Sequence, residues 1–275
     1  MTLKARNRML VLFFIIALLD AVLNASLFIQ GMVEQTISFN SDVQRQFKFL
    51  GSFELLGYEP LAVCMSCLAF NAYVLIITAI LYFSFEKTQA LEAVYFQGFL
   101  LSCMAESSRL LIPLTSLAQS SPSSVAIISR IVIAARLLAP LAFLCAELFS
   151  DTESRQFMER NFLIMLLASI FMGILLPLDT KGFSSTFIYH WGLQDTFHMT
   201  RVLLVCSTLV AIVCKVAINY STETIHEGIG FLMSISGYFI LCNSDNYILL
   251  AVGATALFIG TLYYLHSIHQ IYNWR

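Results

Sequence analysis

The sequence predicts an all-α fold, a polytopic bundle of transmembrane helices, and three observations indicate it. The 275 residues are 59% hydrophobic and only 12% charged, about half of the roughly 25% that soluble domains carry. The mean hydropathy is +0.80. The apolar residues form long runs without the alternation of barrel strands, and about 20 such residues take a helix across a bilayer. Lipid is therefore the expected solvent for most of the chain.

Eight runs are long enough to cross the membrane. The last two are separated by Asn243-Ser244-Asp245-Asn246, a sequence typical of a turn. One unbroken helix there would be about twice the length that a bilayer needs. Seven spans stay open as the alternative, and cleavage of the first span as a signal peptide near Ala25 would also leave seven. The predicted spans are 9–31, 61–84, 91–113, 125–149, 161–178, 199–219, 228–243 and 247–267.

Basic residues indicate the orientation of the bundle, because Lys and Arg concentrate on the cytoplasmic side. With the N-terminus inside, the inner ends hold Lys4, Arg6, Arg8, Lys87, Arg155, Arg160, Lys215 and Arg275, and the outer loops hold Arg45, Lys48 and Lys181. We therefore expect both termini inside. The predicted location is the cell (inner) membrane, with 1–275 forming one integral membrane bundle without a soluble domain.

Composition and motifs exclude several classes of function. The net charge of −2 argues against a nucleic-acid partner. The sequence holds no phosphate-binding loop, dinucleotide fingerprint, zinc-protease motif or nucleophile elbow. All seven cysteines fall within predicted spans, which is not a disulfide framework. We expect no metal and no other cofactor. The expected partners are membrane lipids and a protein at the cytoplasmic side.

Charged residues inside the predicted spans are the candidates for a ligand or ion path. An ionisable group in the bilayer costs at least about 2.5–3.5 kcal/mol, so such groups tend to face the bundle interior and to find partners. These candidates are Asp20, Glu106, Arg109, Arg130, Arg136 and Glu147.

Depth along each span predicts two ion pairs. Glu106 and Arg130 lie seven and five residues from the outer ends of neighbouring spans, roughly 8–10 Å below the boundary at 1.5 Å per residue. Arg109 shares a helix face with Glu106 and is the alternative partner or a third member. Asp20 and Arg136, both near the midplane, form the second predicted pair. The pairs either line a polar path, in which the excess of Arg favours an anion, or only fix helix partners.

Two outer loops are long enough to hold structure of their own or to contact a ligand. In 33–60, Val43, Phe47 and Leu50 share one helical face, which predicts a short helix in the membrane interface. The loop 179–198 is aromatic. Its residues His190, Trp191 and His198 are candidates for contact with an outer ligand, and a belt at the headgroups is the alternative.

The layout resembles the helical membrane sections of bacterial sensor proteins, in which a bundle feeds a cytoplasmic output domain. No motif supports this resemblance, and no output domain follows the last span. We predict a multi-pass, sensor-like protein or partner-dependent subunit without a catalytic domain. One alternative is a small transporter or proton-coupled carrier that uses the charges of spans one, three and four. Another is an intramembrane lipid enzyme with His190, Asp195 and His198. No catalytic residue is assigned.

Overall fold

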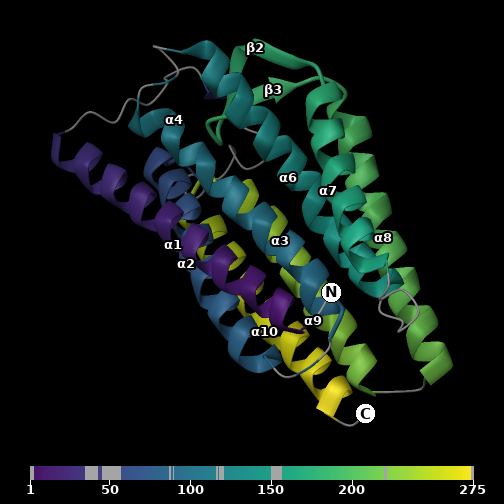
Figure 1. Ribbon diagram of the computed structural model, residues 1–275. Coiled ribbons are helices and arrows are strands. Elements are labelled where there is room, and N and C mark those ends of the chain that lie inside the picture. Colours follow the sequence, from purple (N-terminus) through teal and green to yellow (C-terminus); the bar gives the residue numbers. More distant parts are fainter. Residues whose placement is uncertain are drawn as a thin grey trace.

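A computed structural model describes residues 3–34, 43–44, 57–86, 88, 90–115, 117, 121–149, 157–219 and 222–273. These residues form a bundle of long helices with one small sheet at one end (Figure 1).

Seven helices of the described residues are each long and apolar enough to cross a membrane. The protein is therefore a multi-pass membrane protein of the all-α class. A helix lies at each predicted span, and the predicted turn at 243–246 separates the last two. The seven are α1 (Leu3–Glu34), α2 (Pro60–Phe85), α6 (Pro122–Leu148), α7 (Met158–Leu175), α8 (Gln194–Asn219), α9 (Thr222–Cys242) and α10 (Tyr247–Asn273).

The third predicted span is divided into three consecutive pieces and runs through the interior. They are α3 (Glu92–Ser107), the 3₁₀-helix η3 (Ser108–Leu110) and α4 (Leu111–Leu114). The hydroxyls of Ser107 and Ser108 donate to the carbonyl oxygens three residues earlier, at 2.6 and 2.7 Å. Such bonds compete with the regular helical ladder, which fits the tighter turn that follows. α3 is buried along most of its length, so this helix contacts protein rather than lipid.

The outer helices present apolar side chains to the surroundings. Leu19 of α1, Phe171 of α7 and Val202 of α8 are each exposed by about three-fifths of their surface. In water such surfaces would be unfavourable, whereas in a bilayer they face acyl chains that are equally apolar.

A close helix pair, α9 and α10, is packed through glycines. Gly230 and Gly237 of α9, and Gly253 and Gly260 of α10, repeat every seven residues and lie against the backbone of the other helix. A Cβ atom at Gly237 would come within 2.3 Å of the backbone nitrogen of Leu257. Small residues allow such close approach of helix backbones in membranes.

The beginning of α1 and the ends of α2 and α10 lie together. The Arg6 guanidinium donates to the carbonyl oxygens of Phe85, the last residue of α2, and of Thr88, in the region where the last carbonyls of a helix lack helical partners. The ring of Phe85 packs against His269 of α10, with centroids 5.8 Å apart. The two ends of the chain therefore lie at the same end of the bundle (Figure 1).

The small sheet covers the opposite end of the bundle. β1 (Val43–Gln44) pairs in parallel with β2 (Leu178–Ser184), and β2 pairs with β3 (Tyr189–Trp191) as an antiparallel hairpin near the ends of α6, α7 and α8 (Figure 1). The interfacial helix predicted for 33–60 is wrong at Val43, because its backbone pairs with Phe183 in the sheet. The other two residues of that prediction, Phe47 and Leu50, lie outside the described residues.

Candidate functional site: an arginine cluster under the hairpin

Glu106 is the centre of a buried ion-pair cluster. Its carboxylate accepts from Arg136, with 2.8 Å between Nε and Oε1 and 3.4 Å between Nη2 and Oε2. Arg109 Nε lies 3.1 Å from Oε2. All three side chains are at most 1% exposed. We call Glu106, Arg109, Arg136 and the nearby Arg201 the arginine cluster.

The end of α9 is tied to this cluster through its backbone. The carbonyl oxygen of Cys242, the last residue of α9, accepts from Arg109 Nη1 at 2.8 Å and from Arg136 Nη2 at 3.1 Å. Carbonyls at a helix C-terminus lack helical partners and carry partial negative charge, so cations stabilise them. The two arginines thus join α3, α6 and α9 at one point.

The hairpin covers the cluster with aromatic rings. The Arg136 guanidinium carbon lies 5.7 Å from the Trp191 ring centroid, and Trp191 packs edge-on against Phe197 of α8 at 5.9 Å. Ser129 of α6 holds the hairpin in place by accepting from the backbone N–H of Tyr189 at 3.1 Å. Trp191 is 3% exposed, so it belongs to the wall of the site rather than to a surface belt.

The row of stacked side chains that begins with Arg136, Trp191 and Phe197 continues at Arg201 of α8. Its guanidinium carbon lies 5.3 Å from the Phe197 ring centroid and 4.7 Å from that of Phe239 in α9. Cation–π contacts of this kind gain strength when they are removed from water. Arg201 Nη2 also donates to His198 Nδ1 at 2.7 Å. Because Nδ1 is then the acceptor, the His198 ring carries any N–H on its other nitrogen.

The cluster has more positive charge and more hydrogen-bond donors than the described part of the chain satisfies. Three guanidinium groups contact or surround one carboxylate, so the four side chains sum to 3 − 1 = +2. Arg109 Nη2, Arg201 Nε and Trp191 Nε1 are buried and have no acceptor among the described residues. An unmet buried donor costs about 1–3 kcal/mol. A small anion with two or more oxygens would supply both the charge and the acceptors.

The two ion pairs predicted from depth are wrong. Arg130 is half-buried on α6 and donates to the carbonyl oxygen of Ile174 at the end of α7. Asp20 accepts from Asn24 at 3.2 Å, and its Oδ2 lies 2.9 Å from the Ser107 hydroxyl oxygen. It cannot pair with Arg136 because α1 packs on α2, α3 and α4 rather than on α6. The alternative expectation, that Arg109 is a partner of Glu106, is confirmed.

The remaining sequence candidates lie in different places. Trp191 and His198 contact arginines of the cluster, as described above, whereas His190 lies near Gln194, 3.4 Å from its amide nitrogen. Glu147 belongs to a separate polar group at the other end of the bundle, with Lys215. Arg201 lies within the predicted span 199–219 but is not among the candidates that the sequence indicates. Its spacing from Phe197 and His198, four and three residues, is the helical signal that could have found it.

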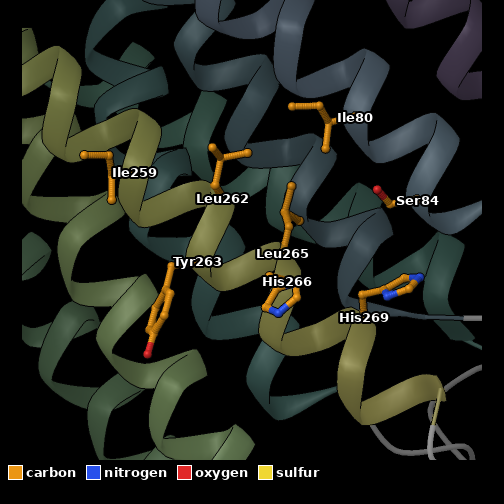
Figure 2. A pocket seen from close by; sticks show the side chains of 8 residues that line it. All are labelled: Ile80, Ser84, Ile259, Leu262, Tyr263, Leu265, His266 and His269. Carbon is orange, nitrogen blue, oxygen red and sulfur yellow. The ribbon is translucent and has the colours of Figure 1, made fainter.

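A groove lies between α2 and α10 at the end where the chain termini meet. It has a volume of about 500 Å³, and Figure 2 shows its lining. Ile80, Ile259 and Leu262 line one part, and Ser84, His266 and His269 follow toward the ends of the two helices. An apolar groove with a polar end suits a membrane lipid, which has an acyl chain and a polar headgroup.

Neither metal chemistry nor similarity identifies the site further. Within the described residues, no group of three or more His, Cys, Asp or Glu side chains could hold a metal ion. Comparison of the chain with protein-family models, with curated proteins and with solved structures finds no match. The function is therefore argued from the geometry of the arginine cluster.

Proposed function

We propose that the protein is a sensor-like membrane protein that binds a small anion, of the carboxylate class, in the arginine cluster. The observation that supports this proposal is the excess of buried positive charge, with donors from Arg109, Arg201 and Trp191 that meet no acceptor within the described ranges. Guanidinium groups bind carboxylates in a planar, often bidentate geometry. The carboxylate of a ligand bound between Arg109 and Arg201 would neutralise positive charge that Glu106 alone does not neutralise.

The cluster is also placed to transmit binding. Its members and their covering rings come from α3, η3, α6, α8, α9 and the hairpin. A ligand that draws Arg201 toward Arg109 would alter the stacking of Arg201 on Phe197 and Phe239 and so shift α8 relative to α9. A ligand changes an equilibrium only through such differential contacts. The output would pass to a partner protein at the predicted cytoplasmic side.

The interior argues for sensing rather than for transport through the bundle. Below the cluster, the rings of Phe96, Phe99, Phe143 and Phe231 pack against one another with centroids 4.7–5.9 Å apart. All four side chains are at most 1% exposed. These rings fill the interior between the arginine cluster and the polar group around Glu147. An anion that binds above them therefore meets an apolar barrier.

A proton-coupled carrier is the second candidate, and one observation favours it. Within the apolar interior, Tyr73 bonds to Thr261 at 2.7 Å, and Thr261 bonds to Ser234 at 3.3 Å. These hydroxyls place some polar groups between the two ends. Proteoliposomes loaded with buffer and given radiolabelled acetate or succinate separate the two functions. A carrier accumulates label inside the vesicles, whereas a sensor binds the anion without net uptake.

The lipid-enzyme alternative has less support. His190 and His198 lie against Gln194 and Arg201 respectively, and Asp195 is exposed at the start of α8. A catalytic base and its orienting acid need direct contact.

The binding proposal is tested with purified protein in lipid nanodiscs. Thermal unfolding is followed with sodium acetate, succinate or phosphate, and sodium chloride at equal ionic strength is the reference. A bound ligand stabilises the folded state, by about 2.7 kcal/mol at one hundred times its Kd. We expect a carboxylate to raise the Tm above the chloride reference.

Two arginine variants provide the matched comparison. Arg201→Gln should remove the carboxylate response, because it deletes a guanidinium that pairs with no carboxylate in the described structure. Arg130→Gln, on the side of α6 that faces α7, should keep that response. The proposal is wrong if no anion differs from chloride, or if Arg201→Gln responds as the wild type does.

A further inference from the structure

A second buried ionic group lies at the end of the bundle opposite the arginine cluster. Lys215 Nζ of α8 lies 3.3 Å from Glu147 Oε2 of α6 and 3.2 Å from Glu227 Oε2 of α9. The two glutamate side chains are at most 1% exposed, and the lysine side chain is 21% exposed. The sequence places the three residues far apart, and the helix packing brings them together.

The two carboxyl groups lie close together because they share one cation. Lys215 Nζ donates to Glu147 Oε2 at 3.3 Å and lies 3.4 and 3.2 Å from the two carboxylate oxygens of Glu227. Two carboxylates that share a buried site repel each other, which favours the binding of a proton by one of them.

The charge balance of Glu147, Glu227 and Lys215 also favours one bound proton. With one proton, the three side chains sum to −1 + 1 = 0, and without it they sum to −2 + 1 = −1, using the contacts of Lys215 with both glutamates. An uncompensated charge is costly within the membrane. The neutral, singly protonated state is therefore the one that the buried environment favours.

The surrounding helices provide no second cation among the described residues. α3 contributes Glu92, whose Oε2 accepts from the Tyr272 hydroxyl of α10 at 2.7 Å. α10 also contributes Tyr264, which is fully buried and whose hydroxyl meets no partner in the described structure. The groups that face the pair are thus Glu92, Lys215, Tyr264 and Tyr272. Lys215 is the cation already counted, and Glu92 can add only negative charge.

We propose that Glu147 and Glu227 form a proton-binding site, in which the two carboxyl groups share one proton and Lys215 balances the remaining negative charge. Loss of that proton leaves two adjacent carboxylates beside one ammonium group, and their repulsion acts between α6 and α9. The site thereby makes the packing of these helices sensitive to pH at the predicted cytoplasmic end. It is independent of anion binding, since no residue is shared with the arginine cluster.

Infrared difference spectroscopy of the protein in nanodiscs tests this proposal. The C=O stretch of a protonated carboxyl group is followed as the pH is raised. An ordinary glutamic acid ionises near pH ~4.3. We expect the wild type to retain a protonated carboxyl signal well above that value and to lose it as the shared proton leaves. Glu147→Gln and Glu227→Gln should each remove this signal, because the remaining carboxylate pairs with Lys215 alone.

Two controls identify the origin of the signal. Glu159→Gln, at an exposed position of α7, should leave it unchanged. Glu92→Gln should also keep it, and loss of the signal in that variant alone would move the proton to Glu92 and overturn the proposal. Persistence of the protonated carboxyl signal in both Glu147→Gln and Glu227→Gln would overturn the proposal as well.

A second measurement needs no variant. The free energy of unfolding is followed between about pH 5 and 8, the range in which proton linkage commonly changes stability. A proton bound more tightly in the folded state makes stability fall as the pH rises, because the unfolded chain binds fewer protons. We expect this decrease in the wild type. Stability that rises across the same range, together with no protonated carboxyl signal, contradicts the site.

Discussion

Arg136 and Glu106 form an ion pair between α6 and α3, with 2.8 Å between Nε and Oε1 and almost no exposure of either side chain. Arg136 also donates to the last carbonyl of α9 at Cys242. One arginine therefore fixes the positions of three helices. Removal of one partner from a buried pair leaves an uncompensated charge, which is far more costly than replacement of both partners.

Glu106→Gln should destabilise the fold strongly. The amide keeps the shape of the side chain but leaves Arg109 and Arg136 without a countercharge, and the expected loss is about 3–5 kcal/mol. Thermal unfolding in detergent, read by size-exclusion chromatography after heating, measures it. Glu159→Gln at an exposed site is the control and should change stability by no more than about 0.5 kcal/mol. If Glu106→Gln and Glu159→Gln lose the same stability, the ion pair of Glu106 adds nothing to the free energy of unfolding.

A double-mutant cycle should find that Glu106 couples to Arg136 and not to Arg130. Contacting residues in one ion-pair network show coupling energies of about 0.5–3 kcal/mol, whereas residues without a shared partner add independently. The cycle compares Glu106→Gln, Arg136→Gln and their combination with the corresponding set for Arg130→Gln. Coupling to Arg130 of the same size would support the pairing that depth alone predicts.

This difference between Arg130 and Arg136 shows what the sequence could predict. The helical class, the spans and the turn at 243–246 depend on local composition, which the sequence contains directly. The depth of a residue follows from its distance to a span end. The direction of its side chain relative to the other helices does not. Arg130 and Arg136 are about 120° apart around the helix axis, and Arg130 faces α7 while Arg136 faces α3.

The position of Trp191 over the arginine cluster could not be predicted from the sequence, for a related reason. Aromatic residues in an outer loop favour a belt at the headgroups, and this general preference outweighed any specific signal in 179–198. In the structure, backbone pairing of β2 with β3 brings Trp191 into contact with Arg136. That contact joins residues 55 positions apart in the sequence, and no local pattern encodes it.

Gly237→Ala should weaken the packing of α9 on α10. The added methyl group would overlap the backbone of Leu257, where no side-chain rotation can relieve the contact. Overpacking of this kind typically costs about 1–3 kcal/mol. The midpoint of thermal unfolding in detergent measures the effect. Ser236→Ala, one residue earlier and exposed, is the matched control and should unfold at the wild-type temperature. An unchanged midpoint for Gly237→Ala would show that the two helices can separate without cost.

Labelling of introduced cysteines should place the arginine cluster at the outer face of the membrane. Leu193→Cys lies between β3 and α8 at a position that is 64% exposed, and Glu86→Cys lies at the opposite end, after α2. Because basic residues concentrate at the end where the chain termini meet, that end should be cytoplasmic. A membrane-impermeant maleimide should therefore label Leu193→Cys in intact cells and Glu86→Cys only after lysis. The wild type controls for the exposed native thiols Cys206 and Cys214. The reverse labelling pattern would place the anion site on the cytoplasmic side and the proton-binding pair outside.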